Sequence, residues 1–146
     1  MQRNIINLNT GEVIIQNIKM TKNSKIEDFY DCDKKIVEIK KRGDNKGRIR
    51  FVNPIESNEI FAYVHFSIDE NFNFRRIIIA PILKGNPNNL SVIEASKLWF
   101  RGVATGEYNE KEESISGTYS WGHFCAQYSP DRDYGIVGGD IRIVFE

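Results

Sequence analysis

The sequence predicts an α+β fold, in which one main helix packs on a curved antiparallel β-sheet of six to eight strands. Apolar residues alternate with polar ones along most of the chain, which is typical of strands. The connections before residue 91 are mostly short, which favours antiparallel hairpins over parallel crossovers. The clearest helical spacing of apolar residues lies in segment 91–105. A chain of 146 residues has the size of one domain, 1–146.

The chain before the main helix is expected to form hairpins and one short helix. Its expected strands are residues 5–8, 13–15, 36–39, 48–51, 59–68 and 72–80. Ser24 precedes Glu27 by three residues, which is the spacing of a capping box. This predicts a short N-terminal helix of one or two turns over 25–31, packed on the sheet. Apolar residues on both faces of strand 59–68 predict that both faces are at least partly covered.

The main helix is expected over 91–105. Ser91 and Glu94 form a second capping-box pattern at its start. The apolar residues that follow recur at helical spacing and include Leu98 and Trp99. This stripe is expected to lie on the sheet, because an amphipathic helix buries its apolar face.

The C-terminal part is expected to complete the sheet. Residues 107–114 are rich in glutamate and predict a loop, whereas 119–128 predicts an aromatic strand and 141–145 a closing strand. Trp99 and Trp121 are expected in the core rather than at an interface, because tryptophan is usually highly buried and both lie on element faces that need covering.

Charge is distributed unevenly, although 20 basic and 20 acidic residues give a net charge of zero. Residues 1–50 hold 12 basic and 7 acidic side chains, while residues 101–146 hold 4 basic and 8 acidic ones. An acidic loop is most often a solvated surface. The alternative is a docking face for a basic partner, because a local field of one sign steers association even at zero net charge.

Residues that commonly carry catalysis or bind metals are few. His65, His123, Cys32 and Cys125 are all expected to be partly buried structural residues, with the two thiols reduced. His123 and Cys125 lie two residues apart on an expected strand, too far for easy proton transfer. The sequence contains no phosphate-binding loop and no nucleophile-elbow motif. No enzyme activity, cofactor or metal site is therefore expected.

The basic residues between Lys34 and Arg50 predict a charged, solvated edge hairpin. A nucleic-acid surface is the alternative, but Phe51 is the one aromatic residue beside these charges, whereas single-strand binding surfaces interleave several. No apolar run approaches the roughly 20 residues of a membrane helix. We therefore expect no direct nucleic-acid partner and no membrane, and keep nucleic-acid association as the least favoured reading.

Several stretches together resemble a known class of proteins. They are the opening Ile6–Glu12, the hairpin from Phe61–Phe66 to Ile77–Ile79, the helix end Leu98–Phe100, the strand Tyr119–Gly122 and the closing run from Gly135 to Ile141–Ile143. This pattern of spaced aromatic and β-branched residues resembles the small single-domain immunity proteins encoded beside bacterial polymorphic toxins, in particular those of contact-dependent growth inhibition systems.

The resemblance implies a cytoplasmic protein without catalysis. It would bind the C-terminal toxin domain of a delivered effector in a stoichiometric complex and neutralise it. Such toxins are often nucleases or ribonucleases with basic substrate clefts, and an acidic surface would match one. The expected partner-binding residues are Glu107, Tyr108, Glu110, Glu112, Glu113, Asp131 and Asp133. The alternative is a small-ligand-binding or enzymatic domain with a pocket between helix 91–105 and the sheet.

Overall fold

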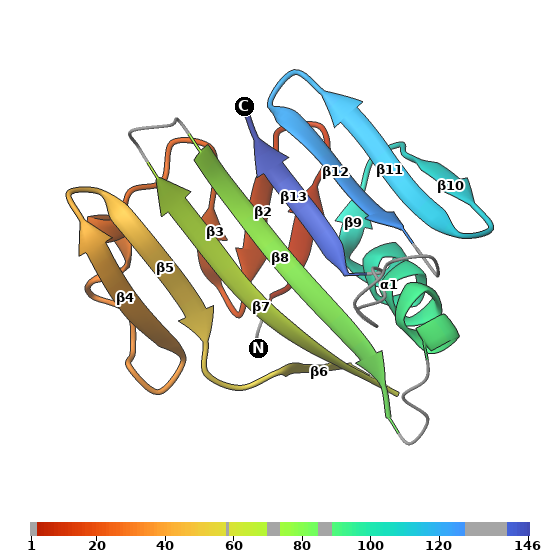
Figure 1. Cartoon of the computed structure of the whole chain (residues 1–146), viewed down its shortest axis with the longest axis horizontal. Coiled ribbons are helices and arrows are strands. Elements are labelled where there is room, and N and C mark those ends of the chain that lie inside the picture. The colour runs from red at the N-terminus through yellow and green to blue at the C-terminus, as the bar shows by residue number, and fades with distance from the viewer. Residues whose placement is uncertain (1–2, 58, 70–73, 85–88, 128–139) are drawn as a thin grey trace.

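The structure, a computed structural model, describes residues 3–57, 59–69, 74–84, 89–127 and 140–146. Within these residues the strands form two sheets, and the larger one has nine strands. From edge to edge its strands are β10 (Asn109–Lys111), β11 (Ser114–Tyr119), β12 (Gly122–Gln127), β13 (Ile141–Phe145), β8 (Phe74–Leu83), β7 (Ile60–Asp69), β5 (Lys46–Phe51) and β4 (Val37–Gly43). A short strand, β6 (Ile55–Ser57), also pairs with β7. All neighbouring strands in this sheet are antiparallel, as predicted (Figure 1).

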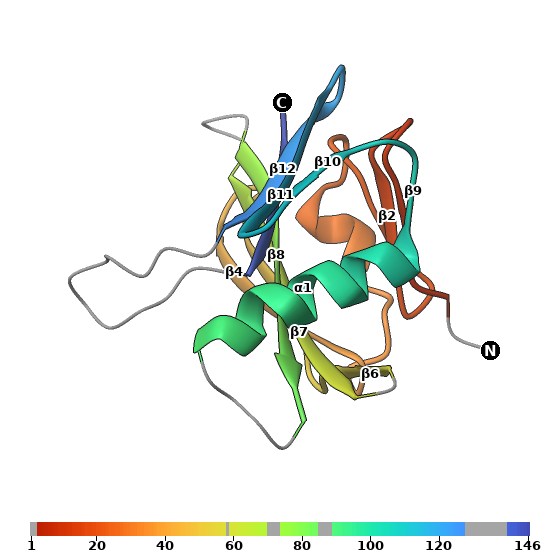
Figure 2. The same ribbon diagram turned by 90° about the vertical axis from the view of Figure 1, so that its right-hand side faces the viewer.

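The smaller sheet joins the segment that follows the main helix to three strands from the first 20 residues. Its strand order is β3 (Ile18–Met20), β2 (Glu12–Ile15), β1 (Ile5–Asn7) and β9 (Ala104–Thr105). Strand β9 follows directly after the main helix, α1 (Asn89–Val103), and pairs in parallel with β1. Figure 2 shows α1 and the smaller sheet on the same side of the larger sheet. The opposite side of the larger sheet is the open face, which none of the described elements covers.

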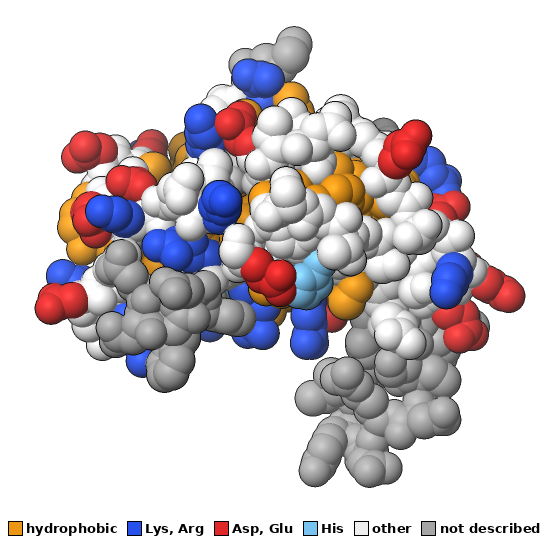
Figure 3. Space-filling model, turned by 90° about the horizontal axis from the view of Figure 1, so that it is seen from above, with side chains coloured by type: hydrophobic (Ala, Val, Ile, Leu, Met, Phe, Trp, Pro, Cys, Tyr) orange, Lys and Arg blue, Asp and Glu red, His pale blue; other side chains and the backbone are white. Residues whose placement is uncertain are grey.

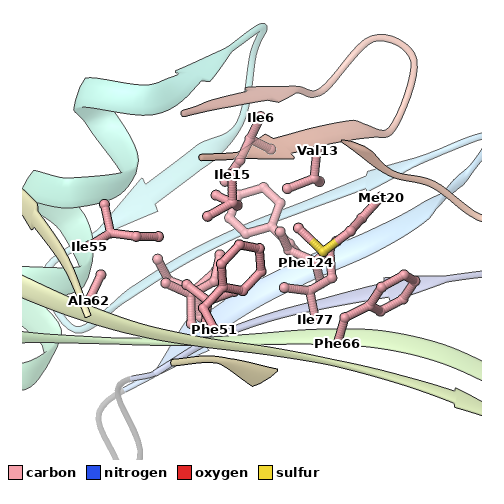
Figure 4. Close-up of a cluster of buried hydrophobic side chains, with 14 of the residues drawn as sticks. Ile6, Val13, Ile15, Met20, Phe51, Ile55, Ala62, Phe66, Ile77 and Phe124 are labelled. Atoms are coloured by element: carbon pink, nitrogen blue, oxygen red, sulfur yellow. The ribbon is translucent and has the colours of Figure 1, made fainter. Parts of the chain in front are cut away.

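The core lies between the two sheets. Alternate residues of the larger sheet, among them Phe51, Phe66 and Ile77, point inward and are buried. They meet Val13 and Met20 from the smaller sheet, which Figure 4 shows pointing toward them. This period-two pattern is the signal that predicted the strands, and burying it is the main favourable contribution to folding.

Trp121 joins the two sheets. It is only 3% exposed, and its indole Nε1 donates a 2.8 Å hydrogen bond to the main-chain oxygen of Leu8. Gly11 packs on the same ring with a φ of 79°, and a Cβ there would lie 2.5 Å from the indole. Two of the stretches that carry the resemblance, one near each end of the chain, therefore meet in space. The expectation that both tryptophans lie in the core is confirmed, since Trp99 is also 3% exposed.

The helix prediction is confirmed in position but not in its buried face. Helix α1 buries Ile93, Trp99 and Phe100 against the sheet, whereas Leu98 is 51% exposed. Leu98 was expected on the sheet, but one residue along a helix turns about 100°, so the position before Trp99 faces solvent. The helix ends at Val103 because Ala104–Thr105 pair with β1.

The expected short N-terminal helix is wrong. The structure has a single 3₁₀ turn there, η1 (Ile26–Phe29), which buries Ile26 and Phe29. The expected Ser24–Glu27 capping box does not form, because the Ser24 hydroxyl accepts from the main-chain N–H of Thr21 instead. The carboxylate of Asp28 accepts from the N–H of Lys25 at 2.8 Å, one residue out of the predicted register.

The larger sheet exceeds the predicted six to eight strands because the C-terminal part contains more hairpins than expected. The expected loop 107–114 forms β10 and the turn into β11. The expected strand 119–128 is interrupted at Ser120–Trp121, where the chain reverses from β11 into β12. Trp121 lies in this turn and points inward.

Candidate functional site

Four of the predicted partner-binding residues gather at one edge of the larger sheet. Glu107 precedes β10, Glu110 lies within it, and Glu112 and Glu113 form the turn into β11; all four are exposed. Strand β10 is the last strand of its sheet on this side, as Figure 1 shows. We call residues 107–113 the acidic edge. It contains four carboxylates and one basic residue, Lys111.

Helix α1 holds the acidic edge in place with two cations. Arg101 Nη2 lies 2.9 Å from Glu110 Oε1, and Lys97 Nζ donates to the main-chain oxygens of Lys111 and Glu112. Glu110 is therefore already paired within the protein. The carboxylates of Glu107, Glu112 and Glu113 form no ion pair with another described residue, so they are the charges that the edge presents to solvent.

Tyr108 has a different environment from its acidic neighbours. Its ring is half-buried and packs edge-to-face on Phe100, with 5.0 Å between the ring centroids. It also contacts Phe124 at 5.9 Å. Phe100 and Phe124 in turn stack on each other at 4.4 Å, between α1 and the sheet. Tyr108 thus holds the start of β10 on the core.

An open pocket of about 440 Å³ adjoins the acidic edge, lined by Glu107, Tyr108, Tyr119 and residues around them. The Tyr119 hydroxyl donates a 2.7 Å hydrogen bond to the main-chain oxygen of Glu107. Burial, followed by the neighbouring Tyr108, raises the pKa of Tyr119, so this hydroxyl remains a donor at neutral pH. Gly117 makes the close approach possible, because a Cβ there would lie 2.2 Å from the Tyr119 oxygen.

The two remaining predicted residues, Asp131 and Asp133, lie outside the described residues. The structure therefore brings Glu107, Tyr108, Glu110, Glu112 and Glu113 together, and leaves the last two predictions untested.

The histidines and cysteines lie apart from the acidic edge. Cys32 is half-buried as expected, whereas Cys125 was expected to be partly buried and is exposed; both are free thiols. His123 Nδ1 lies 3.2 Å from Glu146 Oε1, at the C-terminus. Within the described ranges, no three histidine, cysteine or acidic side chains are grouped so that they could hold a metal ion. Likewise, no helix in this part of the chain is long and apolar enough to cross a membrane.

The opposite edge of the larger sheet is basic. Residues 37–51, which form β4, β5 and their turn, hold six basic and two acidic side chains, and we call them the basic edge. Figure 3 shows Lys and Arg side chains on the side of the molecule that carries β4 and β5, with Asp and Glu side chains among them. Phe51, the aromatic residue that the sequence placed beside these charges, is 3% exposed and belongs to the core.

Strand pairing brings other aromatic residues to the basic edge. Arg50 pairs with His65 of β7, and Tyr63 lies two residues further along β7, 51% exposed on the open face. This arrangement was missed because residues 50 and 65 become neighbours only through non-local pairing. The available signal was the alternation of Phe61, Tyr63 and His65, which marks one face of the strand.

Comparisons of the chain with protein-family models, with curated proteins and with solved structures find no match.

Proposed function

We propose that this protein is an immunity protein, which binds the toxin domain encoded beside it and neutralises that toxin in a stoichiometric complex. The observation that carries the proposal is the acidic edge, where Glu107, Glu112 and Glu113 present carboxylates that no described residue neutralises. The resemblance of the sequence to immunity proteins of contact-dependent growth inhibition systems supports the same function. The partner is then a basic toxin domain of the nuclease class.

The acidic edge suits such a partner in two ways. Its carboxylates attract lysine and arginine side chains, which raises the association rate and disfavours acidic competitors. In addition, β10 pairs with β11 on one side and with no described strand on the other. Main-chain groups on that outer side are available to a strand of the partner, which is a common mode of recognition at sheet edges.

Inhibition in this proposal needs no chemistry from the immunity protein. A tightly bound acidic surface covers the basic cleft of a nuclease and excludes its polyanionic substrate. The complex would form in the cytoplasm, where a delivered nuclease meets its substrate, and would require neither a cofactor nor a metal held by this chain.

The test is co-purification with the toxin domain encoded immediately upstream. The tagged protein and the toxin domain are co-expressed, and the complex is measured by size-exclusion chromatography with light scattering and by toxin activity. We expect a stoichiometric complex in which the activity is lost.

A charge-reversed double variant assigns the surface. Glu112→Lys with Glu113→Lys is expected to weaken binding at least tenfold, because it replaces attraction by repulsion at the rim of the interface. The matched control is Glu27→Lys with Asp31→Lys, which changes two other exposed carboxylates by the same charge. Absence of any complex with the folded protein would contradict the proposal and leave the small-ligand reading, to be pursued by ligand screening. If both double variants bound the toxin domain and abolished its activity equally well, the acidic edge would be rejected as the docking surface.

A further inference from the structure

The open face of the larger sheet carries rings and cations in a regular array. Side chains of directly paired residues in antiparallel strands lie on the same face. Directly paired residues therefore form rows of side chains that run across the strands, and we call each row a line. One line on the open face contains Arg50 of β5, His65 of β7, Ile78 of β8 and Arg142 of β13.

The neighbouring lines extend the array in both directions along β7. On one side of the first line lies Tyr63, paired with Ala80. On the other side, Arg48 and Arg76 flank Ser67. Successive lines are two residues apart, or about 6.6 Å.

Two features show where an anion would lie. Arg50 and Arg142 already have carboxylates nearby, Glu38 at 2.8 Å and Asp140 at 3.7 Å. Arg48, in contrast, forms no ion pair with any other described residue.

Beside it is a cavity of about 240 Å³, whose basic lining residues are Arg42, Lys46, Arg48 and Arg76. Two of these cations have partners within the protein: Lys46 is paired with Asp69 at 3.4 Å, and Arg76 also has an interaction partner. The excess of cations over carboxylates makes this cavity suitable for a phosphate group.

His65 and Tyr63 provide two rings on the same face: His65 lies two residues along β7 from Ser67, which lines the cavity, and Tyr63 lies two residues further. Burial, and then the charges of Arg48 and Arg76, hold the pKa of His65 below its ordinary value, although Asp140 opposes the effect. The imidazole is therefore neutral at pH 7 and presents an uncharged ring. Tyr63 is half-exposed in the middle of the sheet, where burial of its ring by a stacked base would be favourable.

We propose that the open face binds single-stranded nucleic acid, with bases stacked on Tyr63 and His65 and phosphates held by Arg48, beside which Arg76 adds positive charge. A row of rings beside a row of cations is the arrangement that binds single strands with little sequence preference. A duplex keeps its bases stacked inside and would use the cations alone. This proposal does not rest on the toxin-binding proposal, which uses the acidic edge of the same sheet.

The test measures binding of a fluorescein-labelled 12-nucleotide oligothymidine, and of oligouridine of the same length, by fluorescence anisotropy. We expect saturable binding of at least one of them at 50 mM salt. Contact with about two phosphates predicts that the affinity falls about sevenfold between 50 and 200 mM salt.

Single substitutions distinguish the contribution of the rings to oligonucleotide binding from that of the cations. Tyr63→Ala is expected to weaken binding between about fivefold and 150-fold, the range for loss of one stacked base. Its control is Tyr30→Ala, which removes a tyrosine of similar exposure, 43%, from the turn after η1. Arg48→Gln is expected to weaken binding and to lower the slope of log affinity against log salt by about 0.7, with Lys22→Gln as the exposed control. Circular dichroism confirms that each variant is folded.

Three results would overturn the proposal. The first is no saturable binding of either oligonucleotide at 50 mM salt. The second is equally tight binding of a 12-base-pair duplex with no effect of Tyr63→Ala, which would make the face a general cationic surface. The third is displacement of the oligonucleotide by polyglutamate at equal charge concentration, which would assign the face to acidic protein partners.

Discussion

The acidic edge and the basic edge of the larger sheet are opposite in charge and are also held differently. The basic edge is anchored by its own strand, because Val37 of β4 is fully buried and Ile39 is half-buried. In β10 all three residues are exposed, and the acidic edge is anchored from outside, by Tyr108 on the aromatic core and by two cations of α1. Although the net charge of the chain is zero, the two edges of the larger sheet therefore differ in charge, and each is suited to a partner of opposite charge.

The largest expected effect tests this difference in anchoring. Phe100→Ala removes a fully buried ring that stacks on Phe124 and supports Tyr108, and is expected to cost about 3–5 kcal/mol in free energy of unfolding. Val37→Ala, the counterpart under the basic edge, is expected to cost about 1–2 kcal/mol. Urea unfolding measures both. Equal losses would contradict the view that the aromatic cluster is the principal support of the acidic edge.

A pair of glycines sharpens the comparison. Gly117→Ala is expected to destabilise the protein by about 1–3 kcal/mol, because the new methyl group collides with Tyr119, whose ring is stacked on Trp121 and has little room to move. Gly43→Ala in β4 is expected to be nearly neutral, since its Cβ would make only an ordinary 3.8 Å contact with Lys46. A neutral Gly117→Ala would show that the Tyr119 position is not constrained.

The two cations of α1, Lys97 and Arg101, reduce the net negative charge of the acidic edge. Arg101→Gln frees Glu110 and adds one uncompensated negative charge there, so association with a basic toxin domain is expected to become about two- to fivefold faster at low salt. The urea midpoint should change little, because exposed ion pairs contribute little to stability. Stopped-flow association rates at two salt concentrations check this, and a slower association would contradict it.

The smallest expected effect concerns pH and the open face. Because the pKa of His65 is lowered in the folded protein, the unfolded chain binds the proton more readily. His65 therefore lowers stability as the pH falls below about 6.5, and the loss levels off once the pH is below the folded-state pKa. His65→Gln is expected to reduce the difference in urea midpoint between pH 7.5 and pH 5.5. An unchanged difference, or a His65 pKa above 6.5 by NMR titration, would contradict this.

The sequence predicts one edge of the sheet far better than the other. Ile49 and Phe51 alternate with arginines, so the strand of the basic edge is visible locally. At the acidic edge the residues of β10 have no apolar alternation, because the strand is held by α1 rather than by its own side chains. The carboxylates were nevertheless predicted as a site, since a cluster of like charge is visible without knowledge of the fold.

Other features depend on contacts that a single sequence does not contain. The packing of Tyr108 on Phe100 and Phe124 requires knowing where α1 lies. The exposure of Leu98 depends on which side of α1 meets the sheet, and two neighbouring apolar residues leave that choice open. The array on the open face depends on the pairing of β5 with β7, which joins Arg50 to His65 across a non-local connection.

The most direct test of the account compares the two edges against one toxin domain. Affinity is measured by isothermal titration calorimetry for Glu112→Lys with Glu113→Lys, and for Lys40→Glu with Lys41→Glu at the basic edge, at 50 and 300 mM salt. We expect the first pair to weaken binding at least tenfold, with the larger effect at low salt, and the second pair to leave it unchanged or strengthen it. Loss of binding only with the basic-edge pair would contradict the assignment of toxin binding to the acidic edge.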